Sequence, residues 1–195
     1  MSALGALLAG GRSRRMGTDK ALLPVGQGTL LDYMAARLRA LPLDEVIICR
    51  DAPGCLADVV PDLGPLGALH SLSLRYPGRT LLLVPVDMPL LGTATLEALL
   101  QGVDGAPRHY ADHPLPLRLP LTPTTIAAIA ARTKTDARDR SLAGLLRELG
   151  ATALPPPADL GEFANLNHPD DWARLRDRIE QPGPARPASG TIFSQ

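Results

Sequence analysis

The residues best suited to chemistry come directly after the first apolar run of the chain. Two adjacent glycines, Gly10 and Gly11, end this run. The cations that follow them are Arg12, Arg14, Arg15 and Lys20. Because glycine carries no Cβ, backbone N–H groups beside it can converge on an anion, which nearby cations then neutralise. The segment predicts a polyphosphate-binding loop at the carboxyl end of a strand, where open α/β sheets bind ligands.

The spacing of this loop differs from two common phosphate-binding patterns. A Walker loop would need glycine where Met16 stands, and Ser or Thr after Lys20. The dinucleotide fingerprint requires one residue between its first two glycines, whereas Gly10 and Gly11 are adjacent. A glycine-rich turn with solvated arginines is the structural alternative to a phosphate site.

A second candidate is Asp87, which follows the most strand-like run of the chain, Thr80 to Val86. A carboxylate beside a bound triphosphate can hold Mg²⁺, which takes one or two carboxylates together with phosphate oxygens and water. A turn or helix-capping aspartate is the alternative. Because the cationic loop lies upstream, we interpret Asp87 as a Mg²⁺ ligand.

A third candidate segment is Asp62-Leu63-Gly64-Pro65-Leu66-Gly67. Gly64 and Gly67 would let a ligand approach the backbone closely. The Asp62 carboxylate could accept a hydrogen bond from a ring N–H or a ribose hydroxyl. The same residues could also form only a loop that enters a helix.

Two further groups lie in the second half of the chain. Asn165 and Asn167 alternate before Pro169, so both side chains could reach one ligand, although asparagines before a helix are usually caps. His109 and His113 lie in a proline-rich, extended stretch without helical spacing. We therefore predict a structural or substrate-side role for His113 rather than metal binding or catalysis.

The elements that must position these residues alternate between apolar strands and helical patterns, which indicates a mostly parallel sheet with right-handed crossovers. The expected strands cover 4–8, 45–49, 56–60, 80–86 and 151–154, with a short extended piece at 21–25 and a hairpin-like sheet edge within 106–119. The expected helices begin near residues 30, 64, 93, 123, 141 and 169. We expect one α/β domain over 1–180 and a disordered tail over 181–195, which is rich in Pro, Gly, Ser and Ala.

Composition narrows the function further. The chain has 195 residues, a 45% hydrophobic content, a formal net charge of zero and only 3% aromatic residues. This argues against a nucleic-acid binder or a membrane-surface protein. Cys49 and Cys55 are predicted to be free thiols in a reducing compartment, and no stretch approaches the roughly 20 apolar residues that span a bilayer. We expect a cytoplasmic protein.

The loop residues Leu8 to Lys20 read Leu-Ala-Gly-Gly-x-Ser-x-Arg-Met-Gly-x-Asp-Lys. This pattern resembles the MobA-like nucleotidyltransferases of molybdenum cofactor biosynthesis, and the similarity spans nearly the whole chain, most strongly before residue 90. The resemblance implies a single three-layer, Rossmann-like nucleotidyltransferase domain.

The resemblance also implies roles for individual residues. The catalytic residues would be Lys20, Arg15 and Asp87. The nucleotide-binding residues would be Leu8, Ala9, Gly10, Gly11, Arg12, Lys20, Asp62, Gly64 and Asp87, with Asp87 also the metal ligand. The residues on the pterin side would be His113, Asn165 and Asn167.

The reaction implied is transfer of GMP from GTP to Mo-molybdopterin, with Mg²⁺ as cofactor and release of pyrophosphate. Ala9-Gly10-Gly11 favours guanine, because the related cytidylyltransferases tend to carry Ala-Ala-Gly. Family members often show an asparagine at the end of the second strand, where this chain has Cys49. This departure weakens the inference of a guanine pocket. The alternatives are cytidylyl transfer to molybdopterin, nucleotidyl transfer to a sugar phosphate, or a GTP-binding protein that delivers cofactor to molybdoenzymes or their chaperones.

Overall fold

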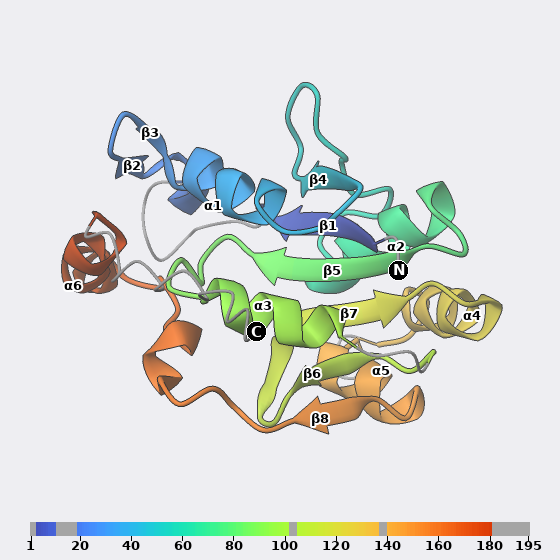
Figure 1. Ribbon diagram of the computed structural model, residues 1–195. Coiled ribbons are helices and arrows are strands. Elements are labelled where there is room, and N and C mark those ends of the chain that lie inside the picture. Colours follow the sequence, from blue (N-terminus) through green and yellow to red (C-terminus); the bar gives the residue numbers. More distant parts are fainter. Residues whose placement is uncertain (1–2, 11–18, 102–104, 137–139, 181–195) are drawn as a thin grey trace, which may run out of the picture.

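The computed structural model describes residues 3–10, 19–101, 105–136 and 140–180. A six-stranded sheet lies at the centre, with the strand order β4-β1-β5-β7-β6-β8 (Figure 1). Its strands are β1 (Ala3–Leu8), β4 (Glu45–Cys49), β5 (Thr80–Pro85), β6 (Arg108–Tyr110), β7 (His113–Pro120) and β8 (Thr152–Leu154). A separate hairpin pairs β2 (Pro24–Val25) with β3 (Gly28–Thr29).

The sheet is mostly parallel, as the sequence predicts. β1 pairs in parallel with β4 and β5, and β6 pairs in parallel with β8. Among these strands only β7 runs the other way, antiparallel to β5 and β6. Leu8 is in register with Cys49 on one side and Pro85 on the other, so β1, β4 and β5 end at the same edge.

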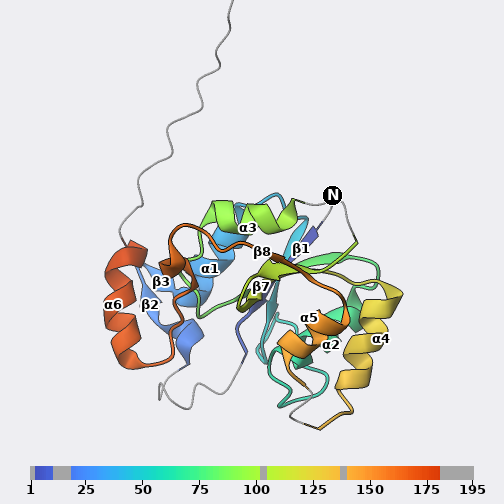
Figure 2. The same cartoon turned by 90° about the horizontal axis from the view of Figure 1, so that it is seen from below.

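Helices cover both faces of the sheet and give three layers (Figure 2). The helices are α1 (Leu30–Arg39), α2 (Pro65–Arg75), α3 (Thr93–Leu100), α4 (Pro123–Arg132), α5 (Leu142–Glu148) and α6 (Pro169–Glu180), with 3-10 turns η1 (Lys20–Leu22) and η3 (Leu160–Phe163). α1 and α3 cover one face with α6 beside them, and α2, α4 and α5 cover the other.

Alternating side chains of β5 divide the core between these two faces. Leu82 and Val84 pack in the cluster that contains the α1 and α3 residues. Leu81 and Leu83 pack in the cluster that contains residues of α2, α4 and α5. Because both faces are covered, the strand is apolar throughout, which explains its continuous hydrophobic run.

Local capping signals set where the helices begin. The Thr29 side chain accepts from Asp32 N, and the Asp32 carboxylate accepts from Thr29 N, which forms the expected capping box of α1. Thr122 caps α4 by accepting from Thr125 N, with Pro123 at the first helical position. These predicted helix starts are therefore confirmed.

The strand expected at 56–60 was a wrong prediction. Leu56 makes an isolated bridge with Cys49, and the pairing stops there. Val59 N donates instead to the hydroxyl of Ser71 on α2, at 2.8 Å. The next residue but one is Pro61, which has no N–H to donate to a neighbouring strand. The segment therefore lies against α2 and does not extend the sheet.

The stretches 21–25 and 106–119 differ in part from expectation. Lys20–Leu22 forms the turn η1, and only Pro24–Val25 is extended. β6 and β7 do form a hairpin, but β8 pairs with β6, so the hairpin lies inside the sheet rather than at its edge. The predicted tail over 181–195 lies outside the described residues, and a domain boundary at residue 180 stays a prediction. None of the described helices is long and apolar enough to cross a membrane.

Candidate active site

The carboxyl ends of β1 and β5 open into a cleft of about 540 Å³. Ala9 and Gly10 follow β1 at this edge, and Val86 and Asp87 follow β5. The residues that line this cleft are Leu8, Ala9, Gly10, Asp19, Lys20, Ala21, Pro65, Pro85, Val86, Asp87, Met88, Asp112, His113, Pro114, Leu115 and Asn165. Many of the predicted site residues therefore meet at one edge of the sheet.

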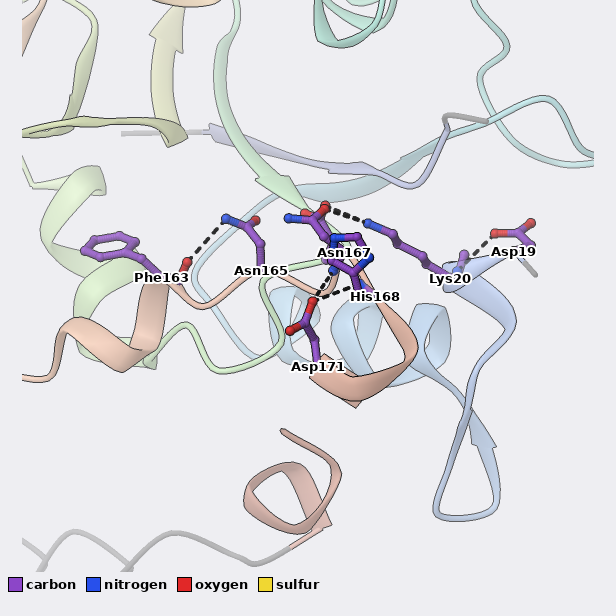
Figure 3. A network of polar contacts seen from close by, with 9 residues as sticks. Asp19, Lys20, Phe163, Asn165, Asn167, His168 and Asp171 are labelled. Atoms are coloured by element: carbon purple, nitrogen blue, oxygen red, sulfur yellow. Dashed lines mark hydrogen bonds and ion pairs between the residues drawn. The ribbon is translucent and has the colours of Figure 1, made fainter. Parts of the chain in front are cut away.

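Lys20 is the first residue of η1, and its side chain points across this cleft (Figure 3). Its Nζ lies 3.0 Å from Asn167 Oδ1, to which it donates a hydrogen bond. The same Nζ lies 3.6 Å from Asp87 Oδ2. The ammonium group is thus held between a carboxylate from the end of β5 and an amide from the segment before α6.

Asp87 is held by its backbone as well as by Lys20. Its carbonyl accepts a hydrogen bond from Leu166 N at 2.8 Å, and Leu166 is fully buried. Burial raises the pKa of the Asp87 carboxyl, and the nearby Lys20 ammonium opposes this rise. The carboxylate form is therefore favoured by cationic neighbours, of which a metal ion would be one.

The segment Asn165-Leu166-Asn167 lies between η3 and α6. Leu166 faces the core, and the two asparagines flank it. Asn165 lines the cleft, and Asn167 binds Lys20. The backbone N–H groups of Asn167 and His168 both donate to the Asp171 carboxylate, which lowers its pKa (Figure 3).

His113 also lines the first cleft, at the start of β7. Its ring stacks on Phe163 of η3, with ring centroids 4.0 Å apart. The turn before it places Asp112 at φ 63°, in the left-handed region. His109 Nδ1 lies 2.7 Å from the Tyr110 carbonyl and 3.1 Å from the His113 carbonyl. The His109 ring therefore contacts the backbone of the β6–β7 hairpin.

Asp62 and Gly64 line a second cleft of about 820 Å³. It shares Leu8, Gly10 and Pro65 with the first cleft, so the two are adjacent. Gly64 has φ 57° and precedes α2, a conformation that glycine adopts without strain. The predicted nucleotide-binding residues are thus divided between two neighbouring clefts.

Three predicted residues, Gly11, Arg12 and Arg15, lie outside the described residues. One contact that sequence reasoning missed is an ion pair between Asp19 and Arg50, with Asp19 Oδ2 2.8 Å from Arg50 Nη2. The signal was available in principle, because Arg50 directly follows a predicted strand that neighbours β1.

Within the described ranges, no group of three or more His, Cys, Asp or Glu side chains could hold a metal ion. Three carboxylates line the first cleft, those of Asp19, Asp87 and Asp112, and Asp87 is the one that pairs with Lys20. A single half-buried carboxylate fits Mg²⁺ only when phosphate oxygens and water complete the coordination. The donor set thus fits a cation that binds together with a nucleotide.

Comparison with known proteins identifies the family. Residues 5–152 match the family model described as the MobA-like NTP transferase domain. The chain belongs to this family. A relative from Xanthomonas euvesicatoria pv. vesicatoria, named molybdenum cofactor guanylyltransferase, is 41% identical over 175 residues, which cover 88% of this chain and 93% of that protein.

Solved structures share the fold of this NTP transferase. A nucleotidyl transferase from Methanothermobacter thermautotrophicus has a TM-score of 0.69 at 18% identity, covering 91% of this chain and 97% of that one. Molybdopterin-guanine dinucleotide biosynthesis protein A from Archaeoglobus fulgidus has a TM-score of 0.67 at 18% identity, covering 90% and 97%. The family assignment makes this MobA-like protein a nucleotidyltransferase.

Proposed function

We propose that the protein is a molybdenum cofactor guanylyltransferase, which transfers GMP from GTP to Mo-molybdopterin and releases pyrophosphate. The sequence relative from Xanthomonas, matched over most of both chains, supports this choice of substrates through its name. The tripeptide Ala9-Gly10-Gly11 also supports guanine, because the resembling cytidylyltransferases tend to carry Ala-Ala-Gly.

The observation that carries the proposal is the pairing of Lys20 with Asp87 across the first cleft. Their polar atoms lie 3.6 Å apart, although 67 positions separate them in the chain. A cation and an acid at the carboxyl edge of a parallel sheet are what a metal–triphosphate complex requires. The Lys20 ammonium would contact phosphate oxygens, and the Asp87 carboxylate would contact the metal ion.

The proposed reaction needs little proton chemistry. A terminal phosphate oxygen of molybdopterin attacks the α-phosphorus of GTP, a new P–O bond forms, and the bond to the β-phosphate bridging oxygen breaks. The nucleophile is already an anion at neutral pH, so no general base is required. Catalysis then depends on alignment and on compensation of negative charge.

Each residue assigned to the phosphates has a distinct proposed task. Lys20 neutralises charge on the α-phosphate and the leaving group, and Asn167 holds its Nζ in place. Asp87 would hold Mg²⁺, which supplies charge compensation at the phosphate oxygens when it is bound. Arg15, Gly11 and Arg12 are proposed to contact the phosphates from the loop.

The acceptor would bind on the other side of the cleft. His113 stacked on Phe163 offers a flat surface, and Asn165 offers an amide at the rim. We propose that these groups contact the pterin, whereas Asp62 and Gly64 in the second cleft contact the nucleoside. The two substrates would then meet near Lys20.

The test is pyrophosphate release by the purified protein with Mo-molybdopterin, Mg²⁺ and either GTP or CTP. The proposal predicts release with GTP and a much slower rate with CTP. Preference for CTP would make the protein a cytidylyltransferase and refute the guanine assignment. Tight GTP binding without release would favour a non-catalytic delivery protein.

A further inference from the structure

Arg50, the residue after β4, lies beside the end of β1, where Leu8 is in register with Cys49. Ala9 N donates to the Cys49 carbonyl at 3.0 Å, which continues the pairing beyond β1. A Cβ on Gly10 would lie 3.5 Å from that carbonyl and 3.8 Å from Arg50 Cα. The start of the cationic loop therefore runs alongside Arg50.

The end of the same loop is attached to Arg50 through Asp19. Asp19 Oδ2 lies 2.8 Å from Arg50 Nη2, and the guanidinium side chain is only 15% exposed. The other carboxylate oxygen, Oδ1, accepts from Ala21 N at 3.0 Å and caps η1. Asp19 thus connects Arg50 to the turn whose first residue is Lys20.

The charge of Arg50 matters as well as its position. Asp19 lines the first cleft beside Lys20, whereas Arg50 lines the second. An uncompensated carboxylate at that place would repel a triphosphate. Arg50 compensates this charge from the second cleft, outside the lining of the first.

We infer that Arg50 is a positioning residue for Lys20: through Asp19 it fixes the start of η1, where Lys20 lies. The inference builds on the proposed function, because it concerns the geometry of the same phosphate site. Arg50 is not assigned a contact with the reacting atoms. Its effect is carried by the ion pair with Asp19.

A surface ion pair often contributes almost nothing, which is the obvious objection. Here, however, the arginine is largely covered, and its Nε is buried with no hydrogen-bond partner within the described residues. Removal of Asp19 would leave a covered guanidinium without its carboxylate, which costs more than removal of both partners. The pair should therefore behave as one unit.

The experiment compares Arg50→Ala, Asp19→Asn and the double variant, with Arg50→Lys as the conservative replacement. The matched control is Arg79→Ala, which removes an ion pair with Asp44 at the opposite, amino edge of the same sheet. Pyrophosphate release gives kcat and KM for GTP, calorimetry gives the Kd of Mg²⁺–GTP, and thermal unfolding reports whether each variant is folded.

The inference predicts that each single variant lowers kcat/KM by about 10- to 100-fold, as expected when a catalytic group is misplaced by about 1 Å. The double variant should be no worse than the worse single variant, and Arg50→Lys should recover part of the loss. Arg79→Ala should keep wild-type kinetics.

Two results would overturn the inference: normal kinetics in Asp19→Asn while Arg50→Ala fails, or single effects that multiply in the double variant. Both would mean that Arg50 acts without Asp19. If the wild type releases no pyrophosphate, the proposed function fails instead. The Kd values for Mg²⁺–GTP would then still test the coupling between Arg50 and Asp19.

Discussion

Lys20 is the residue on which the proposed chemistry depends most. Its Nζ is shared between Asn167 Oδ1 and Asp87 Oδ2, so it is placed from two sides. Its side chain is 16% exposed, which reduces screening by water. A lysine held in this way can compensate charge on a phosphate without first having to reorganise.

We predict that Lys20→Ala lowers guanylyl transfer by about 10²–10³-fold, the usual loss for one charge-stabilising contact. The fold should persist, since Lys20 lies in a cleft and not in the core. Steady-state pyrophosphate release, with thermal unfolding as the check on folding, measures this. Near-normal turnover in a pure sample would remove Lys20 from the mechanism.

Sequence reasoning found the residues at strand ends but not the contacts between them. Lys20 and Asp87 could be chosen because each follows a predicted parallel strand, and such strands end at one edge. The bond from Lys20 to Asn167 joins residues 147 positions apart, and no local signal encodes it. The pairing of Asp19 with Arg50 was missed although Arg50 directly follows the strand predicted at 45–49.

At the scale of the elements, the start of α6 matters because it continues the segment that holds Lys20. The Asp171 carboxylate accepts from Asn167 N at 2.9 Å and from His168 N at 2.8 Å. These bonds favour the ionised carboxylate and lower its pKa below the ordinary value of 3.8. They also satisfy N–H groups at the beginning of the helix.

The pH dependence of this cap follows from the direction of the Asp171 pKa shift. Since the pKa is lower in the folded state, the stabilisation is complete above about pH 4 and is lost as the pH falls through the lower folded value. Asp171→Asn should therefore lower the Tm at pH 7, whereas the two proteins should converge near pH 2.

The neighbouring variant Asp170→Asn is the control, because its side chain makes no hydrogen bond or ion pair in the described part of the chain. It should leave the Tm at pH 7 nearly unchanged. A Tm difference between wild type and Asp171→Asn that stays constant from pH 7 to pH 2 would contradict this account of the cap.

Helices were predictable because their signals are local, whereas strand roles were not. Thr29 with Asp32, and Thr122 with Pro123, lie next to the helices that they start. The strand expected at 56–60 fails because Val59 N finds Ser71 on a helix, a partner distant in sequence. Whether the β6–β7 hairpin forms the edge of the sheet depends on β8. This strand pairs with β6 although it lies more than 40 positions later in the chain.

At the scale of the whole molecule, two separate apolar clusters hold the sheet that carries the site. Leu83 of β5 is fully buried in the cluster formed with α2, α4 and α5. Asp87 is the second residue beyond the end of the same strand. Stability of the core and placement of the proposed metal-binding carboxylate are thus linked through one element.

We predict that Leu83→Ala destabilises the protein by about 2–5 kcal/mol, through lost transfer free energy and a cavity. The matched control is Leu74→Ala on α2, where the side chain is 58% exposed, and a change of about 0.5 kcal/mol or less is expected. Denaturant unfolding measures both. Equal effects at the two positions would contradict the assignment of the core.

The central claim is that a triphosphate with its metal ion binds at the Lys20–Asp87 pair, with the phosphates beside Lys20 and the metal ion on Asp87. It is tested most directly by a crystal structure with a non-hydrolysable GTP analogue and Mn²⁺. The account predicts the cation on the Asp87 carboxylate, phosphate oxygens within hydrogen-bond distance of Lys20 Nζ, and the guanine in the cleft that contains Asp62 and Gly64. A nucleotide bound elsewhere, or a metal ion that does not contact Asp87, would contradict it.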